Sequence, residues 1–150
     1  MRIATGALVA LFLLGACGGT ASAPAASAAP AAPAATPAPA ASVKVVDSPK
    51  LGKILANAAG FTLYTYKPDT ADTSNCSGGC ATTWPPVTVT GDAVAAAGMT
   101  GKLGTTTRKD NGAKQVTYNS MPLYAYLQDK AAGDANGEGL GGNWFVIKNP

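Results

Sequence analysis

The sequence contains no histidine, and this absence excludes several kinds of site. Imidazole is the base of the usual serine and cysteine nucleophile pairs and a common ligand of zinc, copper and haem iron. A c-type haem cannot be attached either, because its attachment motif ends in histidine. Charged residues are also sparse, at 13% of the chain, and no basic run alternates with aromatic residues. A nucleic acid is therefore not expected as a partner.

The first sixteen residues have the pattern of a bacterial export signal. Arg2 gives a basic start, and residues 3–14 form an apolar run that is too short for a membrane-spanning helix, which needs about 20 residues. The run ends in Leu14-Gly15-Ala16-Cys17, which resembles the lipobox of bacterial lipoproteins. That resemblance implies cleavage after Ala16 and a covalent lipid on Cys17, whose acyl chains would anchor the protein in a membrane. The alternative is an ordinary secretory signal that is followed by a cysteine by chance.

Residues 17–42 predict a spacer. After Cys17 this segment contains only alanine, proline, serine, threonine and glycine, and its scattered prolines prevent a continuous helix. We therefore expect one folded domain at residues 43–150, held away from the lipid surface. The predicted location is the bacterial cell envelope, at the outer membrane or the outer face of the cytoplasmic membrane.

An internal repeat dominates the predicted domain. Residues 63–69 recur as residues 123–129, sixty positions later, and the same register aligns Trp84 with Trp144. Seven positions are identical in this ungapped frame. Such self-similarity predicts two tandem copies of one supersecondary unit, at about 51–90 and about 111–148, which pack together as one domain.

The residue pattern within each copy is typical of β-strands. Alternation places Tyr64 and Tyr66 on one face of a strand, and the second copy repeats this pattern. Turn residues at 57–60 and 119–120 precede the two tyrosine strands.

Further strands are predicted in the second half of the domain. An Asn-Gly pair at 111–112 predicts a hairpin between strands at 103–108 and 114–118. The apolar run at 143–148 predicts a closing strand buried on both faces, and only residues 92–98 look helical. We therefore expect an all-β fold, a small antiparallel sandwich or barrel with one short helix at most.

These features resemble a family of bacterial secreted-repeat lipoproteins. The family motif is Tyr-x-(Phe/Trp/Tyr)-x-x-Asp, and it is present here twice, as Tyr64, Tyr66 and Asp69 and as Tyr124, Tyr126 and Asp129. The resemblance covers nearly all of the predicted domain. It implies export, but no activity and no catalytic residues, because the function of the family is unknown.

Cys76 and Cys80 flank a Ser-Gly-Gly segment in the first copy. An exported chain meets an oxidising compartment, so the pair predicts a structural disulfide that closes a short loop. The alternative is a redox-active thiol pair or a Cu(I) site, since two thiolates suit Cu(I).

The motif residues are candidates for a binding surface. Tyr64, Tyr66, Tyr124 and Tyr126, with Trp84 and Trp144, could stack a sugar, a quinone or a peptide. The alternative is that these rings pack together in the core, with the tyrosine hydroxyls reaching Asp69 and Asp129. The two aspartates are then expected to accept backbone N–H bonds at turns. Because they occupy equivalent positions, they lack the unlike environments of a catalytic acid and base.

Asp134, Asn136 and Glu138 are weak candidates for calcium ligands. They offer oxygens at alternate positions, as in the opening of a calcium-binding loop, but the twelfth position is Phe145 rather than glutamate. We therefore predict no metal or other cofactor beyond the lipid on Cys17, and no catalysis. The predicted function is to bind an envelope protein, a glycan or a small molecule, and the alternative is a redox or copper-handling accessory protein that uses Cys76 and Cys80.

Overall fold

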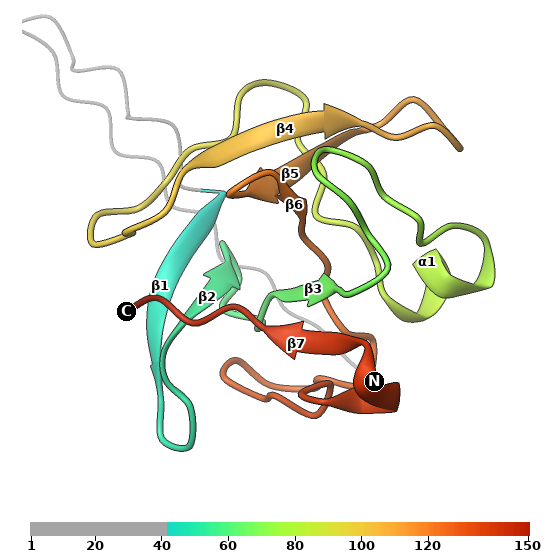
Figure 1. Cartoon of the computed structure of the whole chain (residues 1–150). Coiled ribbons are helices and arrows are strands. Elements are labelled where there is room, and N and C mark those ends of the chain that lie inside the picture. The colour runs from blue at the N-terminus through green and yellow to red at the C-terminus, as the bar shows by residue number, and fades with distance from the viewer. Residues whose placement is uncertain (1–41) are drawn as a thin grey trace, which may run out of the picture. The chain divides into compact units, whose positions relative to one another are not determined.

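The computed structural model describes residues 42–150, so the predicted signal sequence, Cys17 and most of the spacer lie outside the described residues. Short strands and turns dominate this range (Figure 1). Its elements are β1 (Val43–Ser48), β2 (Gly52–Asn57), β3 (Tyr64–Tyr66), α1 (Gly79–Thr83), β4 (Leu103–Thr107), β5 (Lys114–Tyr118), β6 (Met121–Pro122), the 3-10 turn η1 (Leu140–Gly142) and β7 (Trp144–Val146). No helix in residues 42–150 has the length and apolar character needed to cross a membrane.

The strands form three small antiparallel sheets. β1 pairs with β2, β3 pairs with β7, and β4, β5 and β6 form a three-stranded sheet. The predicted all-β fold is confirmed, with α1 only five residues long. Over the described range these sheets do not close into a barrel.

The two copies of the repeat are related by an approximate two-fold axis. Tyr64 and Tyr124 lie at this axis, because each donates its backbone N–H to the carbonyl of the other, at 2.9 and 3.0 Å. Farther out, the bond from Lys67 N–H to the carbonyl of Asn143, at 2.8 Å, is matched by a bond from Leu127 to Thr83, at 3.0 Å. Strand β3 of the first copy lies beside β7 of the second (Figure 1). Each copy therefore completes the backbone pairing of the other.

The predicted hairpins are present. β4 and β5 pair around the Asn-Gly turn, where Gly112 has a φ of 72° and donates its N–H to the carbonyl of Arg108 at 3.0 Å. Asn119 and Ser120 join β5 to β6 with φ values of 49° and 68°, a left-handed pair that suits the twist of a two-residue hairpin.

Three details of the prediction are wrong. Residues 92–98 are not helical, because their backbone groups pair with β1, as in the bond from Val43 N–H to the carbonyl of Val94 at 3.3 Å. The closing strand β7 has one exposed face, on which Phe145 is 41% exposed. The second tyrosine segment forms only isolated bridges, to Tyr64 and Pro86, and proline has no N–H to extend such a ladder.

The core consists of two clusters on opposite sides of the tyrosine segments. Leu63 and Leu123 point into one cluster, with residues such as Val116 and Tyr118. Their chain neighbours Tyr64 and Tyr124 point into the other, whose buried members also include Ile54, Cys76, Trp84, Trp144 and Val146. The alternation seen in the sequence therefore places leucine on one side and tyrosine on the other.

Candidate functional site

Four aromatic rings form a continuous stack across the two-fold axis. Tyr66 stacks on Trp144 with ring centroids 4.3 Å apart, Trp144 on Trp84 at 3.8 Å, and Trp84 on Tyr126 at 4.1 Å. The two tryptophan planes are nearly parallel, at 5°. Because members of the two copies alternate along the stack, neither copy can form it alone.

Tyr64 and Tyr124 meet this stack edge-on. Tyr64 contacts Trp84 and Tyr124 contacts Trp144, both with ring centroids 5.2 Å apart. Both tyrosines are 0% exposed, and the tryptophans are 4% and 6% exposed. The structure therefore places these four rings in the core rather than on a binding surface, and only Tyr66 and Tyr126, at the ends of the stack, are half-buried.

The first tyrosine of each motif donates its hydroxyl to the motif aspartate of the other copy. The Oη of Tyr64 lies 2.7 Å from Oδ2 of Asp129, and the Oη of Tyr124 lies 2.6 Å from Oδ2 of Asp69. The second oxygen of each carboxylate accepts a backbone N–H, from Asn75 to Asp69 at 2.7 Å and from Asn136 to Asp129 at 2.9 Å.

The motif aspartates therefore hold turns in place, as the core-packing alternative predicted. The ungapped register of the sequence is shifted by one residue here, because Asn136 matches Asn75 rather than Cys76. The second copy has one more residue between its aspartate and this asparagine than the first.

Burial sets the protonation of this cluster. It raises the pKa of the Tyr64 and Tyr124 phenols far above the usual range, and the hydrogen bonds to Asp129 and Asp69 raise these pKa values further. Burial also raises the pKa of Asp69, against the opposing effects of the hydrogen bonds from Tyr124 and Asn75 and of a nearby guanidinium. Both phenols are therefore neutral donors at any physiological pH.

That guanidinium belongs to Arg108, a residue that the sequence did not single out. Its side chain is almost fully buried and donates to the carbonyl of Cys76 at 2.7 Å, to Ser74 Oγ at 3.0 Å and to Gln115 Oε1 at 2.8 Å. It also forms an ion pair with Asp110 at 2.6 Å. The only signal in the sequence is a polar residue, Gln115, at an inward-facing position of a predicted strand.

Cys76 and Cys80 form the predicted disulfide, with Cα atoms 5.3 Å apart. Cys76 is fully buried against the aromatic cluster, and Cys80 lies in α1. The bond therefore joins the loop that follows Asp69 to the short helix that precedes Trp84. Since each sulfur is bonded to the other, this state presents no thiolate that could bind Cu(I).

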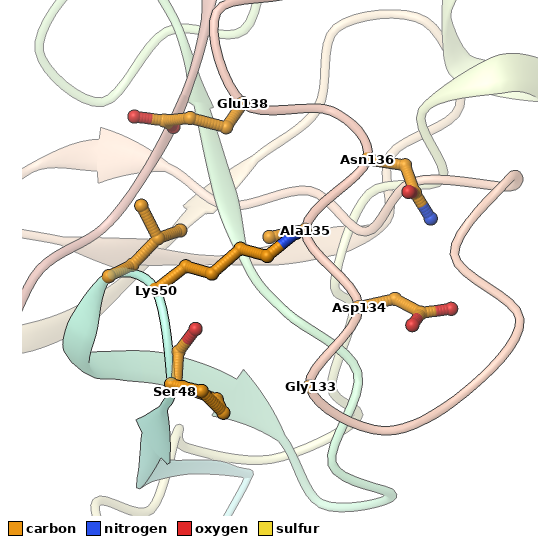
Figure 2. Close-up of a pocket in the computed structure, with 9 residues that line it drawn as sticks. Ser48, Lys50, Gly133, Asp134, Ala135, Asn136 and Glu138 are labelled. Carbon is orange, nitrogen blue, oxygen red and sulfur yellow. The ribbon is translucent and has the colours of Figure 1, made fainter.

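The side chains of the three weak calcium candidates form hydrogen bonds with different backbone groups. Asp134 Oδ2 accepts the N–H groups of Lys130 and Ala131, both at 2.8 Å, and these bonds lower the pKa of its carboxyl. Glu138 Oε2 accepts the N–H of Val146 at 2.6 Å, and its side chain points away from those of Asp134 and Asn136 (Figure 2). Residues 42–150 contain no cluster of three or more acidic, cysteine or histidine side chains that could hold a metal ion.

A cleft of about 440 Å³ lies between the turn at residues 48–51 and the loop at residues 133–138. The side chain of Lys50 reaches across it towards Ala135, and Ser48 lies beneath (Figure 2). Glu138 lines the opposite end of the cleft.

The two-fold axis relates this cleft to a smaller one of about 210 Å³ in the other half of the domain, at the turn after β4. There Arg108 replaces Ser48, Asp110 replaces Lys50, and Ser74 replaces Ala135. The larger cleft therefore has the small side chain of Ser48 at the position of the arginine in the smaller one.

The fold and the shared aromatic core define a class: a tandem-repeat β module whose two copies interlock. The chain belongs to the family described as a secreted repeat of unknown function, which matches residues 45–88 and 104–148. The resemblance predicted from the paired motifs is thereby confirmed, and the chain is an extracytoplasmic module. Both matches begin earlier than the predicted repeat bounds, because a β-hairpin opens each copy. No curated protein and no solved structure matches the chain significantly.

Proposed function

We propose that the chain is a lipid-anchored, non-catalytic binding module on the outer side of a bacterial envelope membrane. The lipobox-like sequence that ends at Cys17 supports the anchor, and the family of secreted repeats supports export. The spacer between Cys17 and β1 would hold the domain away from the lipid. The cleft between residues 48–51 and 133–138 is the proposed binding site.

The choice of this cleft rests on one observation: the two halves of the domain have different residues at this position. Tyr64 and Tyr124 are bonded to Asp129 and Asp69, and both carboxylates also accept backbone N–H groups, so these buried pairs have no polar group to offer a ligand. In the other half, Arg108 stands at the position of Ser48 and makes polar contacts with four residues. In this half a cleft of about 440 Å³ lies beside Ser48.

Two carboxylates, Asp134 and Glu138, line the cleft and accept backbone N–H groups. Lys50 is the cationic residue of the lining, and we infer that it binds an anionic group on the ligand. Asp110 binds Arg108 at 2.6 Å, whereas Lys50, at the corresponding position, forms no ion pair with any residue of the described range. A lysine ammonium binds a carboxylate or a phosphate as a point charge. The proposed ligand is therefore a carboxylate- or phosphate-bearing group of an envelope glycan or protein.

The cleft is tested by NMR titration of the chain without its signal sequence. Acetate and methyl phosphate serve as probes, glucose as the uncharged control, and sodium chloride keeps the ionic strength constant. We expect amide shifts at residues 48–51 and 133–138. Lys50→Gln should weaken the binding roughly two- to fivefold, as expected for loss of one exposed ion pair. Lys109→Gln, the same change in the turn of the other half, should have no effect. Equal weakening by both changes would contradict the proposed site.

The anchor is tested by detergent phase partitioning of the chain expressed in a bacterial host. The wild type should enter the detergent phase, and Cys17→Ala should remain in the aqueous phase because it has no acylated side chain. The double variant Cys76→Ser with Cys80→Ser is the control and should partition like the wild type. Detergent partitioning of Cys17→Ala would show that the anchor assignment is incorrect.

A further inference from the structure

The four-ring stack connects two partly exposed rings through two buried ones. Tyr66 and Tyr126, its end rings, are partly exposed, and Trp144 and Trp84 between them are buried. Successive centroids are 4.3, 3.8 and 4.1 Å apart, so all neighbouring rings are in contact. Indole and phenol are the side chains that lose a single electron most readily, and electron exchange is fast between aromatic rings in contact.

The two Tyr–Asp pairs add a proton acceptor at each side of this stack. A phenol that loses an electron becomes a neutral radical only if its proton leaves as well. The phenol of Tyr64 lies 2.7 Å from a carboxylate oxygen of Asp129, and its ring touches Trp84 edge-on. Tyr124 has the same relation to Asp69, at 2.6 Å, and to Trp144. An electron donor and the acceptor for its proton are therefore already in place beside each tryptophan.

We propose that this cluster is a one-electron relay, in which an oxidation that enters through the stack is held at Tyr64 or Tyr124. A small oxidising radical takes one electron from the Trp84–Trp144 pair through Tyr66 or Tyr126 at an exposed end of the stack. The radical is reduced to its anion, and a tryptophan radical cation remains. Tyr64 returns one electron to the tryptophan while its hydroxyl proton moves to Asp129. The products are the neutral tryptophan, the Tyr64 phenoxyl radical and the protonated Asp129.

The reverse step restores the resting state. A small quinol or thiol reductant at the exposed end of the stack gives up one electron and is itself oxidised to its radical. This electron reduces the phenoxyl, and the proton returns from Asp129 to Tyr64. The Tyr124–Asp69 pair works in the same way on the other side of the axis. Burial supports this chemistry in two ways, because it keeps the phenols protonated until they are oxidised and raises the affinity of Asp69 for a proton. None of the relay residues lines the cleft between residues 48–51 and 133–138.

Pulse radiolysis tests the relay directly. Azide radicals oxidise tryptophan selectively, and the absorption of the tryptophan radical and of the phenoxyl radical is then followed in time. In the wild type we expect the phenoxyl signal to rise as the tryptophan signal falls, at a rate independent of protein concentration. A rate proportional to protein concentration, or no phenoxyl signal, would overturn the proposal.

Conservative variants identify the tyrosines. Tyr64→Phe combined with Tyr124→Phe should abolish the concentration-independent rise, and each single variant should reduce its amplitude. Tyr118→Phe is the matched control, because Tyr118 is also buried but lies in the other core cluster, with its hydroxyl 3.4 Å from Thr100 Oγ1 and no carboxylate partner. A full phenoxyl yield in the double variant, or its loss in Tyr118→Phe, would refute the assignment.

The role of the aspartates is tested by the rate of transfer. In Asp69→Asn with Asp129→Asn the proton acceptors are amides, and the transfer should slow by about tenfold or more because a charged hydrogen-bond partner is lost. The wild type in D₂O should also be slower than in H₂O, a test that needs no variant and so does not depend on how the variants fold. Equal rates in the two solvents would show that the proton does not move with the electron.

Discussion

Removal of the Tyr64 hydroxyl is the most direct test of how the two copies are held together. In Tyr64→Phe the ring still packs against Trp84, but the bond of 2.7 Å to Asp129 and the weaker contact of 3.3 Å from the N–H of Gly137 are lost. A hydrogen bond to a charged acceptor contributes about 1.5 to 3 kcal/mol, whereas a domain of this size has a total stability of about 5 to 15 kcal/mol. We therefore expect Tyr64→Phe to lower the free energy of unfolding by about 2 kcal/mol.

Tyr124→Phe should cost a similar amount, because it removes the bond to Asp69 and the hydrogen bond of 2.7 Å with Ser74 Oγ. After that change Asp69 still accepts the N–H of Asn75 and is stabilised by the charge of Arg108. Asp129 in Tyr64→Phe retains only the N–H of Asn136 among the bonds described.

Urea unfolding followed by tryptophan fluorescence measures these differences, because both tryptophans lie in the affected cluster. Tyr66→Phe is the control, since Tyr66 stacks on Trp144 and its hydroxyl has no partner in residues 42–150. We expect a change below about 0.5 kcal/mol for this variant. The reasoning is refuted if Tyr64→Phe loses no more stability than Tyr66→Phe.

Three further predictions concern the polar groups around the core. Because burial raises the pKa of Asp69 in the folded state, the wild type should become more stable relative to Asp69→Asn as the pH falls from about 7 towards 4, as measured by urea midpoints. Arg108→Met should lower stability by about 3 kcal/mol, because Gln115 and a buried carbonyl lose their donor; thermal unfolding would show this, and a loss below 1 kcal/mol would contradict it. Cys76 and Cys80 should give no free thiols in the native protein, and their replacement by serine should cost about 2 kcal/mol; rapid thiol labelling without denaturant would instead favour the redox alternative.

Much of the fold follows from local signals in the sequence. The register of sixty residues identifies equivalent positions, and the alternation of leucine and tyrosine predicts the two sides of the core. The Asn-Gly turn predicts the β4–β5 hairpin, because few other residues accept a positive φ without strain. The cysteine spacing and the exported context predict the disulfide.

The exchange of partners between copies could not be predicted in the same way. The internal repeat shows that each copy has one such tyrosine and one aspartate. It does not show whether the tyrosine binds the aspartate of its own copy or that of the other copy. Only the pairing of Tyr64 with Tyr124 at the axis decides this. Arg108 was missed because a lone arginine next to a turn usually lies in solvent. Its burial depends on Ser74, which is distant in the sequence, and on Gln115, whose inward-facing position was the only signal.

The stacked rings come alternately from the two copies, and each Tyr–Asp bond joins one copy to the other. One copy alone therefore cannot form this core. A chain with a single copy would expose one flat tryptophan face and a tyrosine hydroxyl without its carboxylate. A second molecule of that chain would supply both, by the same two-fold operation that relates the copies here. The domain thus has the internal symmetry of a homodimer within one polypeptide, but its two halves differ where Arg108 takes the place of Ser48 and Asp110 that of Lys50.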